Sequence, residues 1–487
     1  MKILSTQQIR EADAYTIENE PIASIDLMER ASRAFVNWFS ERFSISESRI
    51  KIICGLGNNG GDGLAIARML HPLGYDLEVF VVRYSDKSSA DFDINFARLS
   101  KQLPIQNIDN QASISFDKND LVIDAIFGSG LSRPIDGLVK EIVNKVNESN
   151  AKVVSVDIPT GLFADSPNTP NDCILEADFT VSFQLPKLAF MLPQNDKFVG
   201  EWAVVPIGLS QKFIEDAKTN FYYTNQAQQL IKPRKKFSHK GTFGHGLLIA
   251  GSHGMMGAAV LASKAALRSG IGKISIQSAP SGLEIVQISV PEAIFLIDEV
   301  APQNFDAVGV GPGIGVGREI QQNLGKLFTK IAQHNIPIVI DADAINNIAE
   351  DRSLERQIPK NAILTPHPKE FKKLVNQDWA DDYQKLQILQ QYAINQQVTI
   401  CLKGANTAIA LPDGSIHFNS TGNAGMAKAG SGDVLTGMIL ALLAQGYPTH
   451  EAAILGVYEH GLAGDRAVSK RSINSIIASD IIEEIRF

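Results

Sequence analysis

The sequence contains little cysteine. Only three cysteines occur among 487 residues, at Cys54, Cys173 and Cys401. None of them forms a CxxC pair or a Cys/His spacing typical of a metal site. Two lie in the apolar runs KIICGL and VTICLK. We therefore expect reduced, structural thiols and no disulfide framework, as in cytosolic proteins.

Long apolar segments are also lacking. No run approaches the roughly 20 residues needed to cross a bilayer. The run LTGMILALLA is too short and follows a glycine loop, so it predicts a buried helix. The first residues, MKILSTQQIREADAYTIENEP, have no apolar core of the kind found in signal peptides. We expect a cytoplasmic protein without a membrane partner.

An excess of positive charge is missing, because the formal net charge is −8. Domains that hold nucleic acid are usually basic, so we expect no nucleic-acid partner. Anionic small molecules are not excluded, since backbone amides at helix starts bind phosphate without net positive charge. The 44% hydrophobic and 20% charged residues are typical of a soluble globular protein.

Apolar strands alternate with helical segments over residues 51–207 and again over residues 246–412. This alternation predicts an α/β fold with mostly parallel sheets that helices cover on both faces. The length accommodates two or three domains of roughly 100–200 residues each. A polar, Asn/Gln-rich and then basic segment over 209–236 separates the halves, and we place the junction near residue 222, giving domains 1–222 and 223–487. The basic patch IKPRKKFSHK favours a solvated linker over a phosphate-facing entrance.

The first half contains a glycine loop, GLGNNGGDG at residues 55–63, between an apolar strand and a helical run. Such a turn brings free backbone amides close to a ligand, although it matches the dinucleotide fingerprint only loosely. Asp124 and Asp157 end two later strands. Each alone suits a helix cap, but the carboxyl ends of parallel strands face one crevice. We expect both to converge there with the glycine loop, the Gly128–Gly130 turn and Thr160.

The motifs NNGGDG, DAIFGSGL and DIPTGL, in this order, resemble the YjeF N-terminal domain over about residues 5–215. The resemblance implies a Rossmann-like, three-layer αβα sandwich that epimerises NAD(P)HX, the hydrated form of NAD(P)H. It implies potassium near Asn59, Asp124 and Thr160, where oxygen ligands suit a hard cation. The substrate contacts it implies are Asn58, Asn59, Gly60, Gly61, Asp62, Gly128, Ser129, Gly130, Leu131, Ser132, Arg133, Pro134 and Asp157.

Asp157 is our candidate for the general acid/base of epimerisation. A carboxyl group there can shuttle the proton while the ring nitrogen drives the breaking of the C–O bond. Lys187, in FQLPKLAF, receives little weight, because most lysines are solvated.

The second half contains GSGD, residues 430–433, at the start of an apolar helix. Free amides and the helix dipole make such a start an anion site. Asp433 either stabilises that dipole or deprotonates an attacking hydroxyl, and the motif alone does not decide. KGANT, GPG and TPHPKE each follow a predicted strand, which favours ligand contact for His367. Asp341 and Asp343 are candidates for a magnesium or a structural role.

Seven motifs, from HKGTFG to GSGD, resemble in order the YjeF C-terminal domain, a ribokinase-like NAD(P)HX dehydratase, over about residues 225–487. Ala429 and Lys369 depart from the family's usual glycine and HPGE patterns, at positions without assigned chemistry. The resemblance implies substrate contacts at Ala258, Gly313, His367 and Asp433. It implies nucleotide contacts at Lys403, Gly404, Ala405, Asn406, Thr407 and Gly432.

Together the two resemblances imply an isomerase and lyase that repairs NADHX and NADPHX. The first half, with bound K⁺, would interconvert the R and S forms, and the second would dehydrate the S form with ADP or ATP and Mg²⁺. We expect a homo-oligomer, as related ribokinase-like enzymes often assemble. The alternative is a ribokinase-like small-molecule kinase fused to a non-catalytic Rossmann-like binding module. The retained Asn59, Asp124 and Asp157 argue against it.

Overall fold

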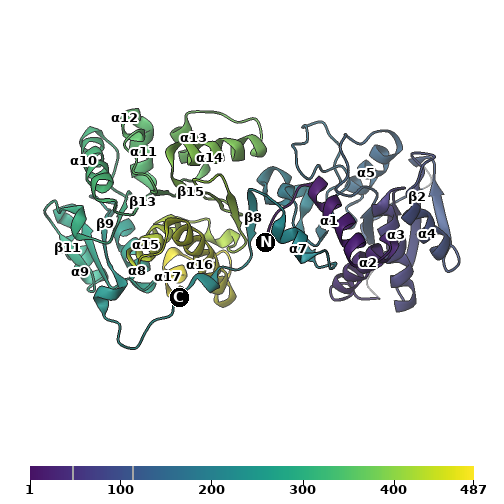
Figure 1. The fold of residues 1–487 in the computed structure, drawn as a ribbon, viewed down its shortest axis with the longest axis horizontal. Coiled ribbons are helices and arrows are strands. Elements are labelled where there is room, and N and C mark those ends of the chain that lie inside the picture. The colour runs from purple at the N-terminus through teal and green to yellow at the C-terminus, as the bar shows by residue number, and fades with distance from the viewer. Residues whose placement is uncertain (46–48, 112–113) are drawn as a thin grey trace. The chain divides into compact units, whose positions relative to one another are not determined.

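The computed structural model describes residues 1–45, 49–111 and 114–487. The chain forms two compact units, each with its own sheet (Figure 1). The first unit comprises Lys2–Thr219 with Asp381–Tyr383, and the second comprises Asn220–Ala380 and Gln384–Phe487 with Met1.

The first unit is built on seven parallel strands in the order β3-β2-β1-β4-β5-β6-β7. The order reverses at β1, which has β2 on one side and β4 on the other. The strands are β1 (Arg49–Cys54), β2 (Leu77–Val82), β3 (Ile105–Ile108), β4 (Asp120–Ala125), β5 (Lys152–Val156), β6 (Phe179–Phe183) and β7 (Glu201–Val205).

Helices cover both faces of this sheet. Successive side chains of a strand point to opposite faces, and in β1 Ile52 belongs to a core with Phe35 and Leu64, whereas Ile53 belongs to a core with Val139. The predicted three-layer αβα sandwich is confirmed. Its helices are α1 (Thr6–Asn19), α2 (Ser24–Ser40), α3 (Asn58–Leu70), α4 (Ala90–Leu99), α5 (Gly137–Ser149), α6 (Asp196–Val199) and α7 (Gln211–Asp216).

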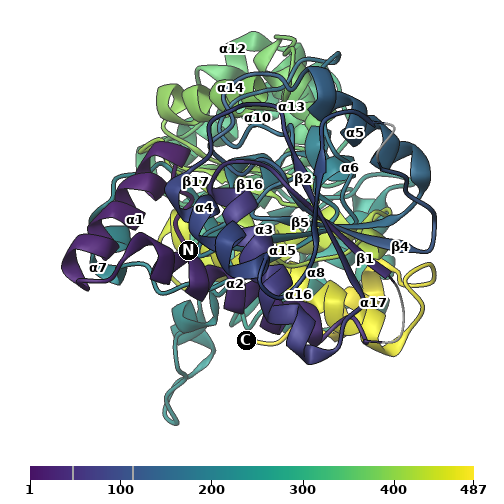
Figure 2. The ribbon, with the colours of Figure 1, turned by 90° about the vertical axis from the view of Figure 1, so that its right-hand side faces the viewer.

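Helix α1 lies at the margin of the first unit, beside α7 (Figure 2). Its buried residues Ala12 and Thr16 are completely covered. Thr16 Oγ1 accepts a hydrogen bond of 2.9 Å from the amide of Ser210, which precedes α7. A capping box between Ser5 and Gln8 begins the helix.

The second unit contains a ten-stranded sheet in the order β11-β10-β9-β12-β13-β14-β15-β16-β17-β8. All neighbouring pairs are parallel except the two that involve β16. The strands are β8 (Phe221–Thr224), β9 (His245–Ile249), β10 (Lys273–Gln277), β11 (Ile294–Leu296), β12 (Ala307–Val310), β13 (Ile338–Ile340), β14 (Ile363–Leu364), β15 (Thr399–Leu402), β16 (Ala408–Ala410) and β17 (Ile416–Asn419).

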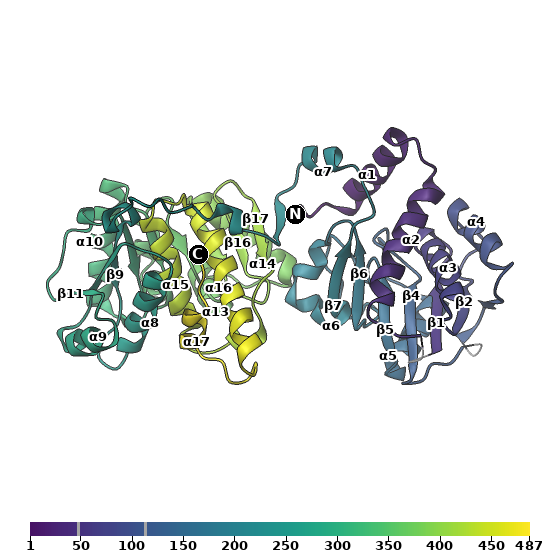
Figure 3. The ribbon, with the colours of Figure 1, turned by 90° about the horizontal axis from the view of Figure 1, so that it is seen from below.

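The apolar helix predicted after GSGD is α15, which packs against β9, β12 and β13 next to α8 and α16 (Figure 3). Helices α10, α11 and α13 lie on the other side of the strands (Figure 1). The helices are α8 (Met256–Arg268), α9 (Leu283–Ser289), α10 (Arg318–His334), α11 (Ala342–Glu350), α12 (Arg352–Glu355), α13 (Pro368–Val375), α14 (Asp382–Gln396), α15 (Ser431–Ala444), α16 (Thr449–Lys470) and α17 (Ala478–Glu483).

The cysteines form no disulfide, and Cys54 and Cys401 are buried, as the sequence predicts. Burial raises the pKa of the Cys401 thiol to about 12, so it stays protonated. No helix among the described residues is long and apolar enough to cross a membrane.

Candidate active sites

The first candidate site lies where the strand order of the first sheet reverses. In open α/β sheets, ligands bind outside the carboxyl ends of the strands at such a point. The loops that follow β1 and β4 approach each other closely there. A Cβ atom at Gly55 would lie 2.0 Å from the carbonyl oxygen of Ile126, so only glycine allows this contact.

Asp124, at the end of β4, is completely buried. Its carboxylate accepts hydrogen bonds from Ser155 Oγ at 2.9 Å, from Thr160 N and Oγ1 at 2.9 and 2.7 Å, and from Ile126 N at 3.2 Å. Burial raises its pKa, although these bonds oppose the shift. Asp124 therefore ties the ends of β4 and β5 to the loop at Thr160.

Asn59, in the first turn of α3, is 8% exposed. A Cβ atom at Gly128 would lie 3.3 Å from its Oδ1, and Phe127 N donates to Thr160 Oγ1 at 3.0 Å. Asn59, Asp124 and Thr160 thus gather around the Gly128 turn. Asn59 Nδ2 has no hydrogen-bond partner among the described residues. A buried polar atom without a partner marks a place for a ligand.

Asp157 directly follows β5 in a left-handed conformation, with φ of +67°. Its Oδ1 accepts hydrogen bonds from Phe183 N at 3.2 Å and from Lys187 Nζ. Lys187 is only 3% exposed, and its Nζ also donates to Ser182 Oγ at 2.8 Å. The expectation that Lys187 is solvated, like most lysines, is wrong, because this lysine is buried and ion-paired with Asp157.

Two further carboxyl groups face this pair. The pKa of Asp62 is raised well above its usual value by burial and then by Asp157 and Asp13. The pKa of Asp13 is raised to about 6 by burial and then by Asp157, while Lys187 opposes the shift. Asp13 lies on α1, in a polar helical segment without a motif, so sequence reasoning missed it. Asp157 and Asp13 thus both interact with Lys187, and Asp62 interacts with both of these carboxyl groups.

The other predicted substrate contacts of the first unit range from buried to exposed. Gly60, Gly61 and Asp62 are buried in the first turns of α3, and Asn58 begins that helix. The carbonyl oxygen of Gly130 accepts a hydrogen bond of 3.3 Å from Arg10 of α1. Ser129 and Leu131 are half-buried, whereas Ser132, Arg133 and Pro134 are exposed beyond the turn.

The second candidate site is a cavity of about 980 Å³ in the second unit. It is lined by the turn between β15 and β16, the start of α11 and the loop before α15. Three of the predicted contacts, Ala258, Gly313 and Asn406, do not line this cavity. Ala258 and Gly313 are close to each other, since a Cβ atom at Gly313 would lie 3.2 Å from the Cβ atom of Ala258. The predicted residues that line the cavity are His367, Lys403, Gly404, Ala405, Thr407, Gly432 and Asp433.

Helix α15 directs its amino end at this cavity. Gly430 is its N-cap, with φ of +88° and no side-chain cap. The amides of the first turn have no partners within the helix. Ser431 and Gly432 line the cavity, so this turn is suited to bind an anion.

Asp341 connects three of the elements that surround the cavity. It is 1% exposed and accepts hydrogen bonds from Lys403 Nζ at 3.0 Å and Thr436 Oγ1 at 2.7 Å. It therefore joins β13, the β15–β16 turn and α15. Asp343 instead accepts a hydrogen bond of 2.9 Å from Gly315 N. Both aspartates thus have structural partners, and no cluster of three or more metal-ligating His, Cys, Asp or Glu residues occurs among the described residues.

Two ionisable groups face the cavity with opposite charge. Burial would lower the pKa of Lys403, but Asp341, Glu370 and Asp433 raise it overall. The pKa of Asp433 is raised to about 6 by burial and by Asp341, with Lys403 opposing. A carboxylate with a pKa near the working pH is suited to general-base catalysis.

His367 combines a structural and a cavity-lining position. Its Nδ1 accepts hydrogen bonds from the amides of Lys369 at 3.1 Å and Glu370 at 3.2 Å, which caps α13. Glu370 returns the contact by accepting a 2.8 Å hydrogen bond from His367 N. The half-exposed ring lines the cavity, so the cap orients it there.

Sequence reasoning missed several polar residues of this cavity, including Asn419, Asn423 and His460. His460 Nε2 lies 3.3 Å from Ser431 Oγ, and burial lowers the His460 pKa to about 4, which keeps the ring neutral. Asn419 ends β17, Asn423 follows this strand, and His460 lies on α16. No short motif connects them with GSGD, and only the fold brings them together.

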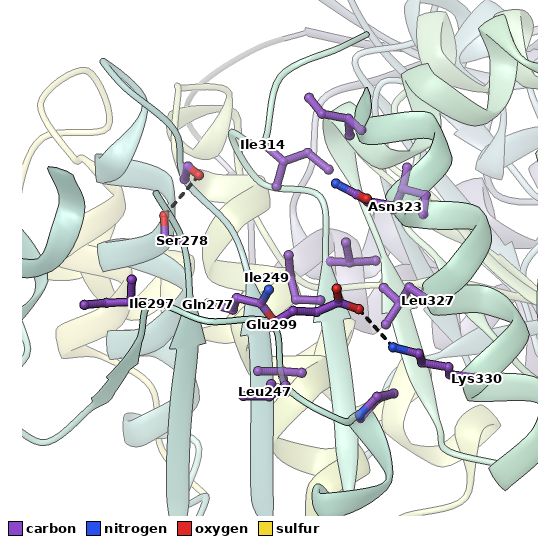
Figure 4. Close-up of a pocket in the computed structure, with 16 residues that line it drawn as sticks. Leu247, Ile249, Gln277, Ser278, Ile297, Glu299, Ile314, Asn323, Leu327 and Lys330 are labelled. Atoms are coloured by element: carbon purple, nitrogen blue, oxygen red, sulfur yellow. Dashed lines mark hydrogen bonds and ion pairs between the residues drawn. The ribbon is translucent and has the colours of Figure 1, made fainter. Parts of the chain in front are cut away.

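A smaller cavity of about 300 Å³ lies between strands β9, β10 and β12 and helix α10 (Figure 4). Its lining is mostly apolar, and Glu299 and Lys330 form an ion pair of 2.9 Å at one side. None of the site residues predicted from the sequence lines it.

The folds and sites define a two-domain α/β enzyme, with a Rossmann-like unit followed by a ribokinase-like unit. Residues 24–189 match the model of the YjeF-related protein N-terminus, and residues 246–486 match that of NAD(P)H-hydrate dehydratase. The chain belongs to the family of bifunctional NAD(P)H-hydrate repair enzymes, which join an epimerase domain to a dehydratase domain.

Curated relatives match nearly the whole chain. The bifunctional NAD(P)H-hydrate repair enzyme of Moorella thermoacetica is 34% identical, over 99% of this chain and 96% of its own. That of Escherichia coli is 29% identical, over 89% and 84%.

Solved structures match the second unit. A ribokinase-like superfamily protein from Enterococcus faecalis is 26% identical with a TM-score of 0.50, over 55% of this chain and 95% of its own. The ADP/ATP-dependent NAD(P)H-hydrate dehydratase of Bacillus subtilis, crystallised with ATP and Mg²⁺, is 30% identical with a TM-score of 0.46, over 52% and 92%.

Lys187→Met should destabilise the first unit by about 3–5 kcal/mol, because it leaves the Asp157 carboxylate buried without its cation. Urea unfolding followed by tryptophan fluorescence measures the change. The matched control is Lys197→Met, which removes the cation of the exposed Lys197–Glu176 pair. It should cost less than about 1 kcal/mol. Equal effects of the two substitutions would contradict the buried pair.

Proposed function

We propose that this protein restores hydrated NADH and NADPH in two steps, one in each unit. The first unit interconverts the R and S forms of NADHX and NADPHX, and the second dehydrates the S form with ADP or ATP. The observation that carries the proposal is Asp433, which lies beside Lys403 at the amino end of α15 in a cavity large enough for phosphate groups.

Epimerisation requires the C–O bond of the hydrated ring to break and form again on the other face. The ring nitrogen supplies the electron pair that expels the hydroxyl, and a carboxyl group moves the proton. Asp157 is suited to this role because Lys187 and the Phe183 amide hold its carboxylate in place. Asn58 to Asp62 and Gly128 to Pro134 are proposed to hold the substrate around it.

Dehydration first makes the ring hydroxyl a better leaving group. Asp433 takes the hydroxyl proton as the oxygen attacks the terminal phosphate of the nucleotide. The amides of Ser431 and Gly432 stabilise the charge on the transferred phosphoryl group. The ring nitrogen then expels phosphate, and loss of a ring proton gives NADH or NADPH.

The nucleotide is proposed to bind the turn from Lys403 to Thr407, with Gly432 against its phosphates. A Cβ atom at Gly432 would lie 3.4 Å from Lys403 Nζ, so the Gly432 amide and the Lys403 ammonium are close enough to bind the same phosphate group. Ala258, Gly313 and His367 are proposed substrate contacts. Mg²⁺ neutralises phosphate charge when it accompanies the nucleotide. Because Asp341 and Asp343 are bonded to protein donors, phosphates and water suit it better as ligands.

Potassium is proposed to bind beside Asn59, Asp124 and Thr160. The residues fit through their oxygen atoms, because the Asn59 amide oxygen lies beside the Gly128 turn, which also holds the Thr160 hydroxyl that bonds the Asp124 carboxylate. Hard oxygen donors of this kind suit an alkali cation. A bound cation would fix the Gly128 turn against α3. We further propose that the protein works in the cytoplasm as a homo-oligomer.

Asp157→Asn should lower the epimerisation rate by about 10²–10⁴-fold, since the amide cannot exchange a proton. Purified R-NADHX is the substrate, and chromatography follows the appearance of the S form. Nucleotide-dependent dehydration of purified S-NADHX serves as the internal control and should be unchanged. A folded variant with full epimerase activity would remove Asp157 from the mechanism.

Asp433→Asn should abolish nucleotide-dependent dehydration while epimerisation continues. In the wild type, kcat/KM for dehydration should fall about tenfold per pH unit below pH 6, because the base form of Asp433 exists only above its raised pKa. Absorbance of the reduced ring and release of phosphate are measured together. Loss of both activities in a folded variant would contradict two separate sites, and a phosphorylated product that accumulates would support a kinase.

Exchanging Na⁺ for K⁺ at constant ionic strength should raise the midpoint of thermal unfolding, because a cation that binds only the native state stabilises it. Asn59→Ala should remove this difference between the salts. Asn119→Ala, at an exposed position of the same unit, should retain it. An identical midpoint of the wild type in both salts would contradict the potassium site.

A further inference from the structure

Helix α1 is anchored across the first site at three points. At its start, Thr6 N donates a hydrogen bond of 2.7 Å to Asp165 Oδ2, in the loop beyond Thr160. One turn later, Arg10 Nη2 donates to the carbonyl oxygen of Gly130 at 3.3 Å. Near its end, Thr16 accepts from Ser210 N at 2.9 Å. The helix is therefore held in place, with Arg10 against Gly130 at one end of the Gly128–Gly130 turn.

Because α1 is held in this position, Asp13 lies near the Asp157–Lys187 ion pair. Asp13 follows Arg10 by three positions, and such residues share one face of a helix. Its carboxyl group interacts electrostatically with Asp157 and Lys187, and it adds to the field at Asp62. Within the described ranges no donor bonds to the Asp13 carboxyl group, whereas that of Asp157 has two. Asp13 is thus free to bond a substrate.

The chemistry of epimerisation calls for two proton-exchanging groups. The departing hydroxyl must gain a proton, and the water that adds to the opposite face must lose one. Asp157, which accepts bonds from an ammonium and an amide, is suited to take a proton. Burial and then Asp157 hold the pKa of Asp62 well above its usual value, so Asp62 gives up a proton less readily than Asp13, whose pKa is raised to about 6. Half-buried Asp13 remains.

We propose that Asp13 is the second acid–base group of epimerisation and acts opposite Asp157. Asp13 protonates the hydroxyl, the C–O bond breaks, and the ring nitrogen forms a double bond to that carbon with its electron pair. Water then adds to the other face, the electron pair returns to nitrogen, and Asp157 takes the proton released. One proton has moved between the two carboxyl groups, and the reverse reaction returns it. This inference rests on the proposed role of Asp157.

The electrostatics of α1 agree with this role. Burial and the Asp157 charge raise the pKa of Asp13 to about 6, while Lys187 opposes the shift. Asp62, Asp157 and Lys187 are the charged groups that face Asp13 from the neighbouring elements, with Arg10 on its own helix. A carboxyl group whose pKa lies near neutrality can both give up a proton and take it back.

Asp13→Asn tests the proposal in the full-length protein. The kcat for conversion of purified R-NADHX to the S form should fall by about 10²–10⁴-fold, while dehydration of purified S-NADHX in the same preparation is unchanged. Asp13→Glu should restore part of the rate. The matched control is Glu11→Gln, which removes the same charge from an exposed position of the same helix and should leave the rate unchanged.

The pH profile separates catalysis from a structural role. In the wild type, kcat/KM for epimerisation should decline above pH 6 as Asp13 loses its proton, and Asp13→Asn should remove this limb. A variant with the wild-type rate, or a slower one that keeps the wild-type limb, would overturn the role of Asp13 and leave the proposed function standing. A wild type without epimerisation would overturn both.

Discussion

Parallel strands direct their carboxyl ends, and the amino ends of the helices that follow them, to the same edge of a sheet. The free amides of those helix starts are partial positive charges that cannot be satisfied within the helix. In the first unit this edge gathers Gly55, Asn59 and Asp124, and in the second it gathers Lys403 and the start of α15. Both sites depend on this one constraint, which lets an acidic chain bind anionic substrates.

Each site also contains a carboxylate–lysine ion pair whose carboxylate is buried, Asp157–Lys187 and Asp341–Lys403. Burial of two charges costs desolvation energy, which only well-made pairs with further hydrogen bonds offset. The two pairs differ in whether the paired carboxylate is itself the proposed proton-exchanging group. Asp341 is bonded to Lys403 and Thr436 as an anchor, so Asp433 is the base that we propose, whereas in the first site the paired carboxylate itself, Asp157, is the proposed proton-exchanging group.

The strands that could be predicted are those with long apolar runs, such as β1, β4 and β12. Strands β3, β8, β11 and β17 were missed, because each has only three or four residues at or next to the margin of its sheet and carries too little apolar pattern. The glycine loops were found for a related reason. A tight turn needs particular residues at consecutive positions, so its signal lies within a short stretch of the sequence.

By itself, the sequence determined the α/β class, the two halves and the family, since apolar alternation and glycine loops are local properties of the chain. Only the tertiary structure decided that Lys187 is buried against Asp157, that α1 brings Asp13 beside them, and that His460 meets Ser431. It also decided that Asn406, Ala258 and Gly313 lie outside the lining of the large cavity. The physical reason is that pairing, burial and the pKa shifts they cause depend on distances between segments far apart in the chain, and those distances exist only once the sheets and helices have packed.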